Sequence, residues 1–230
     1  MSQPWASLTP SQIAAARKAI RSELTERQRT NRLKGYRPYP KQREFHAAGA
    51  EHRERLLMAG NQLGKTLAGA AEMSMHLTGL YPDWWDGRRF DAPIIAMAGS
   101  ETGELTRDGL QRLLVGPPSD EGAWGTGFIP KAAIADTARR QGVADALDTV
   151  SVEHAAGGRS TLLFKSYDQG RRKWQANTVD VVWFDEEPPF DVYMEGLTRT
   201  NATGGIVYLT FTPLLGMSEV VSMFLGMDGK

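Results

Sequence analysis

A chain of 230 residues is long enough for one α/β domain with a sizeable core, and is slightly longer than a usual single domain. Hydrophobic residues make up 41% and charged residues 23%, and no apolar run approaches the length of a membrane span, so membrane insertion is not expected. The chain has no Cys, which excludes disulfides and thiolate metal sites and agrees with a reducing compartment. We see no secretory signal, and the four His residues lack the spacing of a structural zinc site.

The charge is balanced overall but uneven along the chain. Lys and Arg together number 27, as do Asp and Glu, so the net charge gives no argument for nucleic acid. Residues 1–55 nevertheless hold 12 basic side chains against 5 acidic ones, and the segment 180–195 has the opposite bias. A basic segment of this kind can bind nucleic acid or an acidic partner, or can be a solvated helix face, and both interpretations stay open.

Two helices are expected near the N-terminus, on either side of a Pro-rich turn. Residues 11–34 follow a Thr-Pro pair and carry apolar residues at helical spacing, which predicts an amphipathic lead-in helix. The segment 35–40 interrupts helical geometry because its two prolines restrict the residues before them, and a second helix is expected at about 41–50. Further helices are expected at 66–76 and 102–114.

Five short apolar runs predict buried strands. They lie at 56–59, 94–98, 161–164, 179–184 and 206–211. Because helical or looped segments separate them, the pattern favours a mainly parallel sheet. The region 119–158 is weakly patterned, and only short strands and loops are expected there. Trp84 and Trp85, beside a turn, could stack on bases, although aromatic residues in such places are more often core anchors.

A phosphate-binding loop is predicted between the first strand and the helix that follows it. The sequence MAGNQLGKT ends in Gly64, which lets the backbone approach phosphates, Lys65, which supplies a positive charge, and Thr66, whose hydroxyl suits Mg²⁺. Backbone N–H groups at the start of the helix would point at the same anion. The usual pattern opens with Gly where this chain has Ala59, and the glycine stands one place later, at Gly60. Nucleotide binding is therefore the first hypothesis, although the loop matches the usual pattern imperfectly.

A second part of the same site is predicted where an apolar strand ends in three carboxylates. Asp185, Glu186 and Glu187 follow this strand directly. Ligands bind at the carboxyl ends of parallel strands, so these side chains should meet the phosphate-binding loop. We expect Asp185 on the Mg²⁺ side and Glu186 as the general base, with Glu187 facing away or replacing Glu186 if the strand ends one residue later; a solvated acidic turn is the alternative. Thr212, at the tip of the next strand, could bond a catalytic water or a γ-phosphate oxygen.

In this combination the motifs resemble those of the ATPase domain of large terminase subunits, the DNA-packaging motors of tailed bacteriophages. The similarity covers about residues 36–216 and rests on four motifs, whose joint occurrence is more specific than any one of them. The family's phosphate loop is often Gln, an apolar residue and Gly-Lys-Ser/Thr, as in QLGKT here, so the missing first glycine is expected. Asp185 and Glu186 match its acidic pair, and 210–216 (TFTPLLG) resembles its coupling motif.

The resemblance also implies which residues contact the nucleotide. The sequence YPKQ at 39–42 is similar to the family's adenine-recognising segment, with the Gln42 amide on an adenine edge and Tyr39 stacked on the base; alternatively, it is only a turn before a helix. The expected nucleotide-binding residues are Tyr39, Gln42, Gly60, Asn61, Gln62, Leu63, Gly64, Lys65, Thr66 and Thr212. The expected Mg²⁺ residues are Thr66 and Asp185, and Lys65 and Glu186 are the expected catalytic pair.

One departure from the family concerns positive charge. Many terminases have an arginine four residues before the loop lysine, where this chain has Asn61. An arginine that neutralises transition-state charge would then come from elsewhere, and a neighbouring subunit could supply it. Arg171 and Arg172, in the loop before the acidic strand, are the first candidates for this catalytic role, and Arg139 and Arg140 are the second. The same arginines could instead contact DNA phosphates.

The implied fold is a RecA-like P-loop NTPase of the ASCE class, α/β with a mainly parallel central sheet flanked by helices, plus an N-terminal helical lead-in. The implied division is a helical segment at 1–35 and an ATPase domain at 36–230. A complete large terminase resembles this ATPase followed by a ribonuclease-H-like nuclease with bound metal. The residues after 216 leave no room for one, so we expect an isolated ATPase domain, prepared as such or left by cleavage.

The implied function is a Mg²⁺-dependent ATPase, with ATP and Mg²⁺ as cofactors, that translocates double-stranded viral DNA into a procapsid in the host bacterial cytoplasm. The implied partners are that DNA, the capsid portal, the small terminase subunit and further copies of the chain in a ring, although an isolated domain could be a monomer; no membrane partner is expected. Two alternatives stay open. One is a DNA or RNA helicase, against which the missing second RecA-like lobe counts, and the other is a nucleotide-binding scaffold or regulatory module with little hydrolysis.

Overall fold

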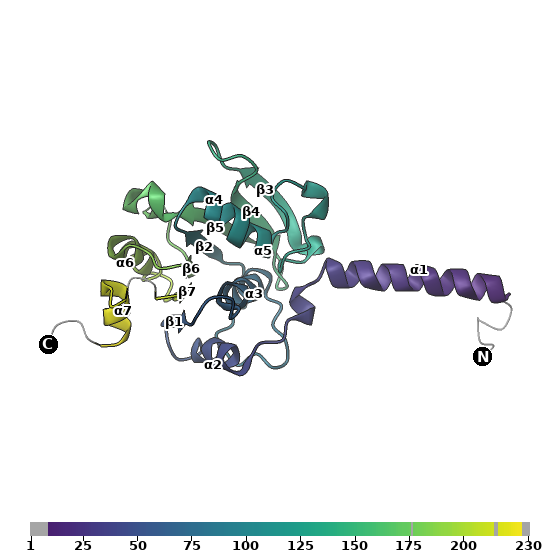
Figure 1. The fold of residues 1–230 in the computed structure, drawn as a ribbon, viewed down its shortest axis with the longest axis horizontal. Helices are drawn as coiled ribbons and strands as arrows, with labels where there is room; N and C mark the ends of the chain where they lie inside the picture. The colour runs from purple at the N-terminus through teal and green to yellow at the C-terminus, as the bar shows by residue number, and fades with distance from the viewer. Residues whose placement is uncertain (1–8, 176, 214–215, 227–230) are drawn as a thin grey trace.

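The computed structural model describes residues 9–175, 177–213 and 216–226. One seven-stranded sheet with helices on both sides forms the body, and α1 extends away from it (Figure 1). The strands are β1 (Glu54–Met58), β2 (Ile95–Ser100), β3 (Ile134–Arg139), β4 (Leu147–Glu153), β5 (Arg159–Ser166), β6 (Val181–Asp185) and β7 (Ile206–Phe211). The helices are α1 (Pro10–Arg29), α2 (Pro40–Ala48), α3 (Lys65–Thr78), α6 (Phe190–Arg199), α7 (Glu219–Phe224), and a continuous run of α4 (Gly103–Leu105), a π-helical turn (Thr106–Gln111) and α5 (Arg112–Leu114). Short 3₁₀ turns are η1 (Leu33–Gly35), η3 (Glu121–Ala123), η4 (Lys131–Ala133), η5 (Tyr167–Gln169) and η6 (Arg171–Trp174).

The strands are arranged in the order β1-β7-β6-β2-β5-β4-β3. From β1 to β5 all neighbours are parallel, and β4 and β3 extend the sheet beyond β5 as antiparallel strands. The five parallel strands correspond to the five apolar runs, so the mainly parallel α/β sheet flanked by helices is confirmed. β3 and β4 lie in the weakly patterned region, where the sequence predicts no more than short strands and loops.

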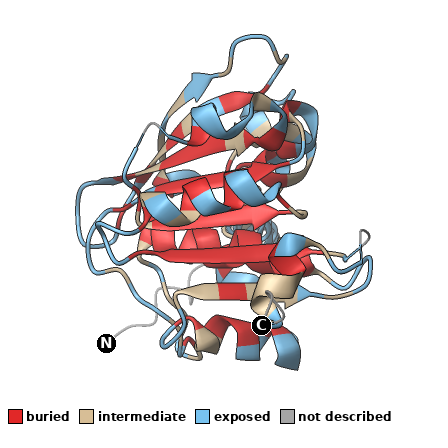
Figure 2. Ribbon diagram, turned by 90° about the vertical axis from the view of Figure 1, so that its left-hand side faces the viewer, coloured by how far each residue is buried: buried red, intermediate tan, exposed pale blue. Residues whose placement is uncertain are grey.

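Side chains of the central strands alternate between two hydrophobic cores, one on each face of the sheet. Trp183 and Tyr208 pack in the core that contains residues of α3, whereas Phe184 and Leu209 pack in the core that contains residues of α6. Every residue of β6 and β7 is buried, and Figure 2 shows the central strands red throughout between helices with exposed outer faces. Strands covered on both faces are continuous apolar runs, which explains why they were visible in the sequence.

The first helix ends earlier than the sequence predicts, and none of its residues is buried. α1 covers Pro10–Arg29 in place of 11–34, and it begins with a capping box formed by Thr9 and Gln12. The helix itself is confirmed, but its apolar stripe packs against no core, and Ile20 and Leu24 are about half exposed. No helix within the described residues is long and apolar enough to cross a membrane.

A buried ionic cluster joins α2, β1 and α3. The Glu72 carboxylate of α3 accepts hydrogen bonds from Arg55 (2.5 Å), His46 (2.6 Å) and His76 (3.3 Å). Burial alone would raise the pKa of Glu72, but Arg55 and the two histidines outweigh it and hold that pKa well below its usual 4.5. Trp85 packs on both histidine rings and is buried, so this tryptophan is a core anchor.

Replacing Glu72 with Gln should cost about 3–5 kcal/mol of stability at neutral pH, because Arg55 would stay buried without its counter-charge. Urea unfolding measures this cost. Glu44→Gln is the matched control, since the exposed Glu44–Lys41 pair should contribute less than about 1 kcal/mol. The folded-state pKa of Glu72 is lowered, so its stabilising effect is complete above about pH 4.5 and is lost as the pH falls further. Acidification should therefore destabilise the wild type more than the variant, and equal stability of the two at neutral pH would contradict this account.

Candidate active site

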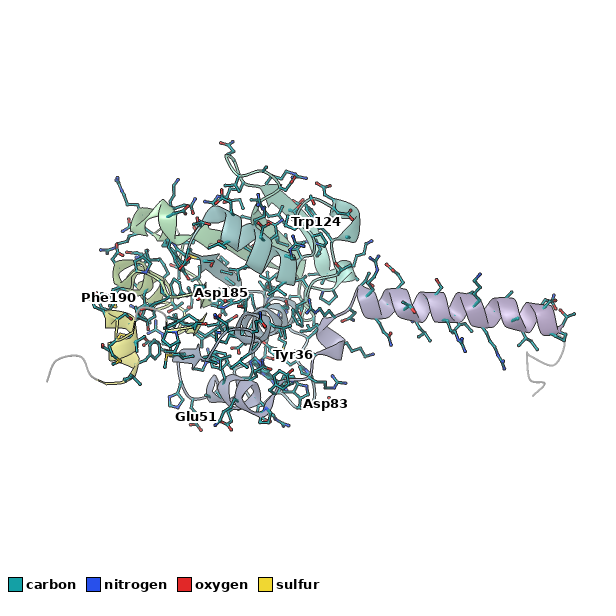
Figure 3. The ribbon with its side chains drawn as sticks, viewed as in Figure 1. Tyr36, Glu51, Asp83, Trp124, Asp185 and Phe190 are labelled. Carbon is teal, nitrogen blue, oxygen red and sulfur yellow. The ribbon has the colours of Figure 1, made fainter. Side chains whose placement is uncertain are left out.

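The segments predicted to form the site meet at one edge of the sheet. The loop after β1 and the ends of β7 and β6 lie side by side because these strands are parallel neighbours, with Asp185 level with Thr210 in the register. Figure 3 labels Asp185 inside the body that the sheet forms, away from α1. The fold therefore brings the phosphate-binding loop and the acidic strand end together from distant parts of the chain.

The loop between β1 and α3 leads into the helix through a left-handed turn. Gly64 has a φ of 76° and immediately precedes α3, and a Cβ at this position would lie 2.9 Å from Nε2 of Gln42. Lys65 is the first residue of α3, and its Nζ donates to the carbonyl of Gly60 (2.7 Å). The first turn of a helix leaves backbone N–H groups without helical partners, so this loop offers an anion both N–H donors and an ammonium group.

Gln42 supports the loop from the start of α2. Its Nε2 donates to the carbonyl of Gly64 (2.9 Å), and its Oε1 accepts from the backbone N–H of Tyr39 (2.9 Å). The side chain of Gln42 is buried, whereas Tyr39 is 69% exposed. The two residues predicted to contact adenine are thus neighbours of the loop, and the Gln42 amide is already bonded within the protein.

Asp185 is held by the hydroxyl group of Thr210 on the neighbouring strand. Trp183 Nε1 donates to Thr210 Oγ1 (2.7 Å), and Thr210 Oγ1 donates to Asp185 Oδ1 (2.7 Å). Because an indole N–H can only donate, the hydrogen of the Thr210 hydroxyl is directed at the carboxylate. Burial raises the pKa of Asp185 to about 7, while hydrogen bonds from Thr210 and Thr66 oppose that rise. The Thr66 hydroxyl and this buried carboxylate are oxygen ligands of the kind that Mg²⁺ prefers, so the predicted metal residues fit the ion.

Glu186 is turned into the site by an unusual backbone conformation. Its φ is +62°, its N–H donates to the carbonyl of Thr210 (3.0 Å), and its side chain is half-buried. Burial raises the pKa of Glu186, and the backbone of Thr212 and the charge of Lys65 oppose that rise. Glu187 is also half-buried, and its Oε2 has no hydrogen-bond partner among the described residues.

Thr212 and Asn61 connect the end of β7 to the phosphate-binding loop. The Thr212 hydroxyl donates to Asn61 Oδ1 (2.9 Å). Asn61 stands where an arginine is often found in terminases, so this position carries a neutral contact to the strand end in place of a charge. Thr210 to Pro213 and Gly216 of the predicted coupling motif are described, whereas residues 214–215 lie outside the described residues.

A cleft of about 900 Å³ opens beside the loop, between α2, β1 and α7. Its lining is mostly apolar, and β1 forms one wall as the edge strand of the sheet. Tyr39, Gln42, Gln62, Leu63 and Lys65 border it. The cleft therefore places the predicted base contacts and the predicted phosphate contacts around a single space.

The candidate arginines make their hydrogen bonds and ion pairs with residues outside this site. Arg171 is ion-paired with the buried Glu195 of α6 (2.7 Å), and Arg172 is exposed on η6. Arg139 pairs with Glu121 and Asp145, and Arg140 donates to Ser166 Oγ (3.0 Å). Within the described residues, none of the four arginines hydrogen-bonds to the loop at 60–66 or to the acidic pair. Their catalytic role remains a prediction.

Three residues that hold the acidic strand end have no role of this kind among the sequence predictions. Trp183 and Thr210 orient Asp185 as described above. Tyr167, which follows β5, directs its buried hydroxyl at the backbone of Asp185 and Glu186. A polar residue directly after a buried strand is the signal that could have indicated Tyr167. Trp183 gives no such signal, because it lies within an apolar strand. Thr210 is predicted only as the first residue of the segment that resembles a coupling motif, and that resemblance does not predict its contact with Asp185.

The fold and this site define an α/β protein of the P-loop class, in which a strand, a Gly-Lys-Thr loop and a helix face an acidic strand end. Residues 56–229 match the family described as terminase large subunit, T4likevirus-type, N-terminal. This chain belongs to that family of large terminase subunits. The resemblance found in the sequence is confirmed.

Individual relatives agree with the family. The terminase large subunit of Salmonella phage P22 is 44% identical over 218 residues, which are 87% of this chain and 44% of the relative. That of Enterobacteria phage LP7 is 28% identical over 219 residues, which are 87% of this chain and 45% of the relative. The chain thus spans about half the length of the curated relatives it matches. A solved structure, the large terminase of a thermophilic bacteriophage in complex with ADP, has a TM-score of 0.46 and 11% identity, covering 84% of this chain and 50% of that chain.

Proposed function

We propose that this chain is the Mg²⁺-dependent ATPase part of a viral DNA-packaging motor, in which ATP hydrolysis drives double-stranded DNA into a procapsid. The observation that carries the proposal is the meeting of the phosphate-binding loop and the acidic end of β6 at one sheet edge, where β1, β7 and β6 are parallel neighbours. Membership of the large terminase family supports it. The loop suits the phosphates, the acidic strand end suits Mg²⁺ and the attacking water, and the cleft suits the base.

ATP would lie with its phosphates on the loop and its base in the cleft beside β1. The N–H groups at the start of α3 and the Lys65 ammonium would hold the phosphates. Thr66 and Asp185 would hold Mg²⁺, whose charge neutralises that of the β- and γ-phosphates. Tyr39 would stack on adenine. Gln42, which borders the same cleft, would lie at the edge of the adenine ring.

Glu186 would take the proton of the attacking water. Burial raises the pKa of its carboxylate, and a higher pKa makes it a better proton acceptor than an exposed glutamate as long as it stays ionised. Thr212 would sense the γ-phosphate, since its hydroxyl contacts Asn61 of the loop and its backbone lies against Glu186. Loss of that phosphate would then change the segment that follows β7.

In an assembled ring of copies, a neighbouring subunit would supply the arginine that stabilises transition-state charge. Arg171 and Arg172 remain the first candidates, and the proposal for Arg171 requires it to leave Glu195. The further partners we propose are double-stranded viral DNA, the capsid portal and the small terminase subunit. The work would take place at the procapsid in the cytoplasm of the host bacterium.

Phosphate release from ATP, measured with and without Mg²⁺ and with double-stranded or single-stranded DNA, tests this function. We expect turnover that needs Mg²⁺ and rises with double-stranded DNA. ATP binding without any turnover, even with DNA and a capsid portal present, would favour the scaffold or regulatory alternative. Strand separation with preference for single-stranded nucleic acid would favour the helicase alternative.

A further inference from the structure

Tyr167 lies at the same sheet edge as the predicted site residues. It is the first residue of η5, directly after β5, and it is 6% exposed. Its hydroxyl lies 3.1 Å from the carbonyl oxygen of Gly99, 2.9 Å from that of Asp185 and 3.1 Å from that of Glu186. A phenol has one hydrogen to donate, so the three carbonyls share it. The hydroxyl therefore joins the ends of β5, β2 and β6.

Two of these three carbonyls belong to the turn that presents Glu186. Glu186 has a φ of +62°, which residues other than glycine adopt only under strain. Along a regular strand, the carbonyls of successive residues point in opposite directions. Those of Asp185 and Glu186 both reach the Tyr167 hydroxyl, which requires the chain to turn at Glu186. The opposite side of the turn is held by the Glu186 N–H, which donates to the carbonyl of Thr210 (3.0 Å).

We propose that Tyr167 is a positioning residue for ATP hydrolysis, whose hydroxyl stabilises the left-handed turn that aims the Glu186 carboxylate at the attacking water. The inference rests on the proposed function, because it assigns Tyr167 to the same general base. Tyr167 acts through the backbone of Glu186, and among the described residues its hydroxyl makes no hydrogen bond to the nucleotide-binding loop. Its loss should therefore change the rate of hydrolysis and leave nucleotide affinity as it is.

The surroundings of Tyr167 allow its hydroxyl to be removed cleanly. The ring packs against Trp174 and Phe184, with centroids 6.0 Å away in each case, so a phenylalanine would keep the same packing. Burial, together with the charges of Asp185 and Glu186, raises the pKa of Tyr167 well above its usual value, so the hydroxyl keeps its hydrogen at neutral pH. Tyr208→Phe is a matched control, because the Tyr208 hydroxyl is also buried and donates to a single backbone carbonyl, that of Gly69 (3.0 Å).

Steady-state hydrolysis and ADP affinity are measured for the wild type and both variants. Tyr167→Phe should lower kcat about tenfold, with KM for ATP and the affinity for ADP unchanged. Tyr208→Phe should keep kcat within about twofold of the wild type, while its thermal midpoint changes by about as much as that of Tyr167→Phe. An unchanged kcat in Tyr167→Phe would overturn the proposal, as would an equal loss of kcat in Tyr208→Phe. Absence of turnover in the wild type would instead overturn the proposed ATPase function.

Two further readouts separate positioning from general loss of structure. In a Glu186→Gln background, Tyr167→Phe should cause no further loss of rate, because both changes act on the same group. Amide hydrogen exchange reports the turn without any activity: the peptide that contains the Glu186 amide should exchange faster in Tyr167→Phe than in Tyr208→Phe. The assignment would be contradicted if the double variant lost rate by the product of the two single losses. It would also be contradicted if the peptide that contains the Glu186 amide exchanged equally fast in Tyr167→Phe and Tyr208→Phe.

Discussion

Replacement of Lys65 by Ala is expected to weaken ATP binding by about 100-fold, because a charge-assisted contact to the phosphates is lost. Within the described residues, Lys65 Nζ bonds only to the carbonyl of Gly60, so the variant should lose little stability. Titration with a fluorescent ATP analogue measures the affinity.

Lys41→Ala is the matched control for this experiment. Lys41 borders the same cleft but is exposed and paired with Glu44, so its removal should change the affinity less than about threefold. If both lysine variants lost the same affinity, the binding would depend on general positive charge near the cleft. If Lys65→Ala bound ATP as tightly as the wild type, the loop would not be the phosphate site.

Replacement of Glu186 by Gln should preserve ATP binding and lower kcat by about 10²–10⁴-fold. The amide has nearly the same shape as the carboxylate, but it cannot accept the proton of the attacking water. Nucleotide affinity and phosphate release, measured on the same preparation, separate the two effects.

Glu187→Gln is the control, because it removes the same charge one residue further along the chain. We expect this variant to retain turnover, since the strand ends at Asp185 and the turned residue is Glu186. Normal turnover in Glu186→Gln together with a large loss in Glu187→Gln would transfer the role of general base to Glu187.

The sequence predicts those parts of the fold that depend on local pattern. β6 and β7 are buried on both faces and are therefore continuous apolar runs. β4 mixes buried, half-buried and exposed residues and lies among glycines and polar residues, so its sequence gives a weaker pattern. The start of α1 is visible because the Thr9-Pro10 pair is a local signal, and the structure shows a capping box at the same place. Whether its apolar stripe would be covered depends on packing partners, and local sequence does not contain that information.

At the site, too, local sequence predicts some features, whereas others depend on long-range packing. Gly64, Lys65 and Thr66 are recognisable because the phosphate-binding loop is a contiguous segment with a fixed spacing. The bond from Thr212 to Asn61 and the convergence of Tyr167 on the acidic strand end depend on which strands become neighbours in the sheet. The order of strands follows from long-range packing, so these contacts could be found only in the folded structure.

A structure of Glu186→Gln with ATP and Mg²⁺ would test most directly whether the loop and the acidic strand end form one hydrolytic site. We expect the γ-phosphate next to Lys65, the metal ion on the side of Thr66 and Asp185, and the replaced side chain facing a water in line with the γ-phosphate. Nucleotide bound away from the loop, or a metal ion that contacts neither Thr66 nor Asp185 directly or through its water ligands, would contradict it.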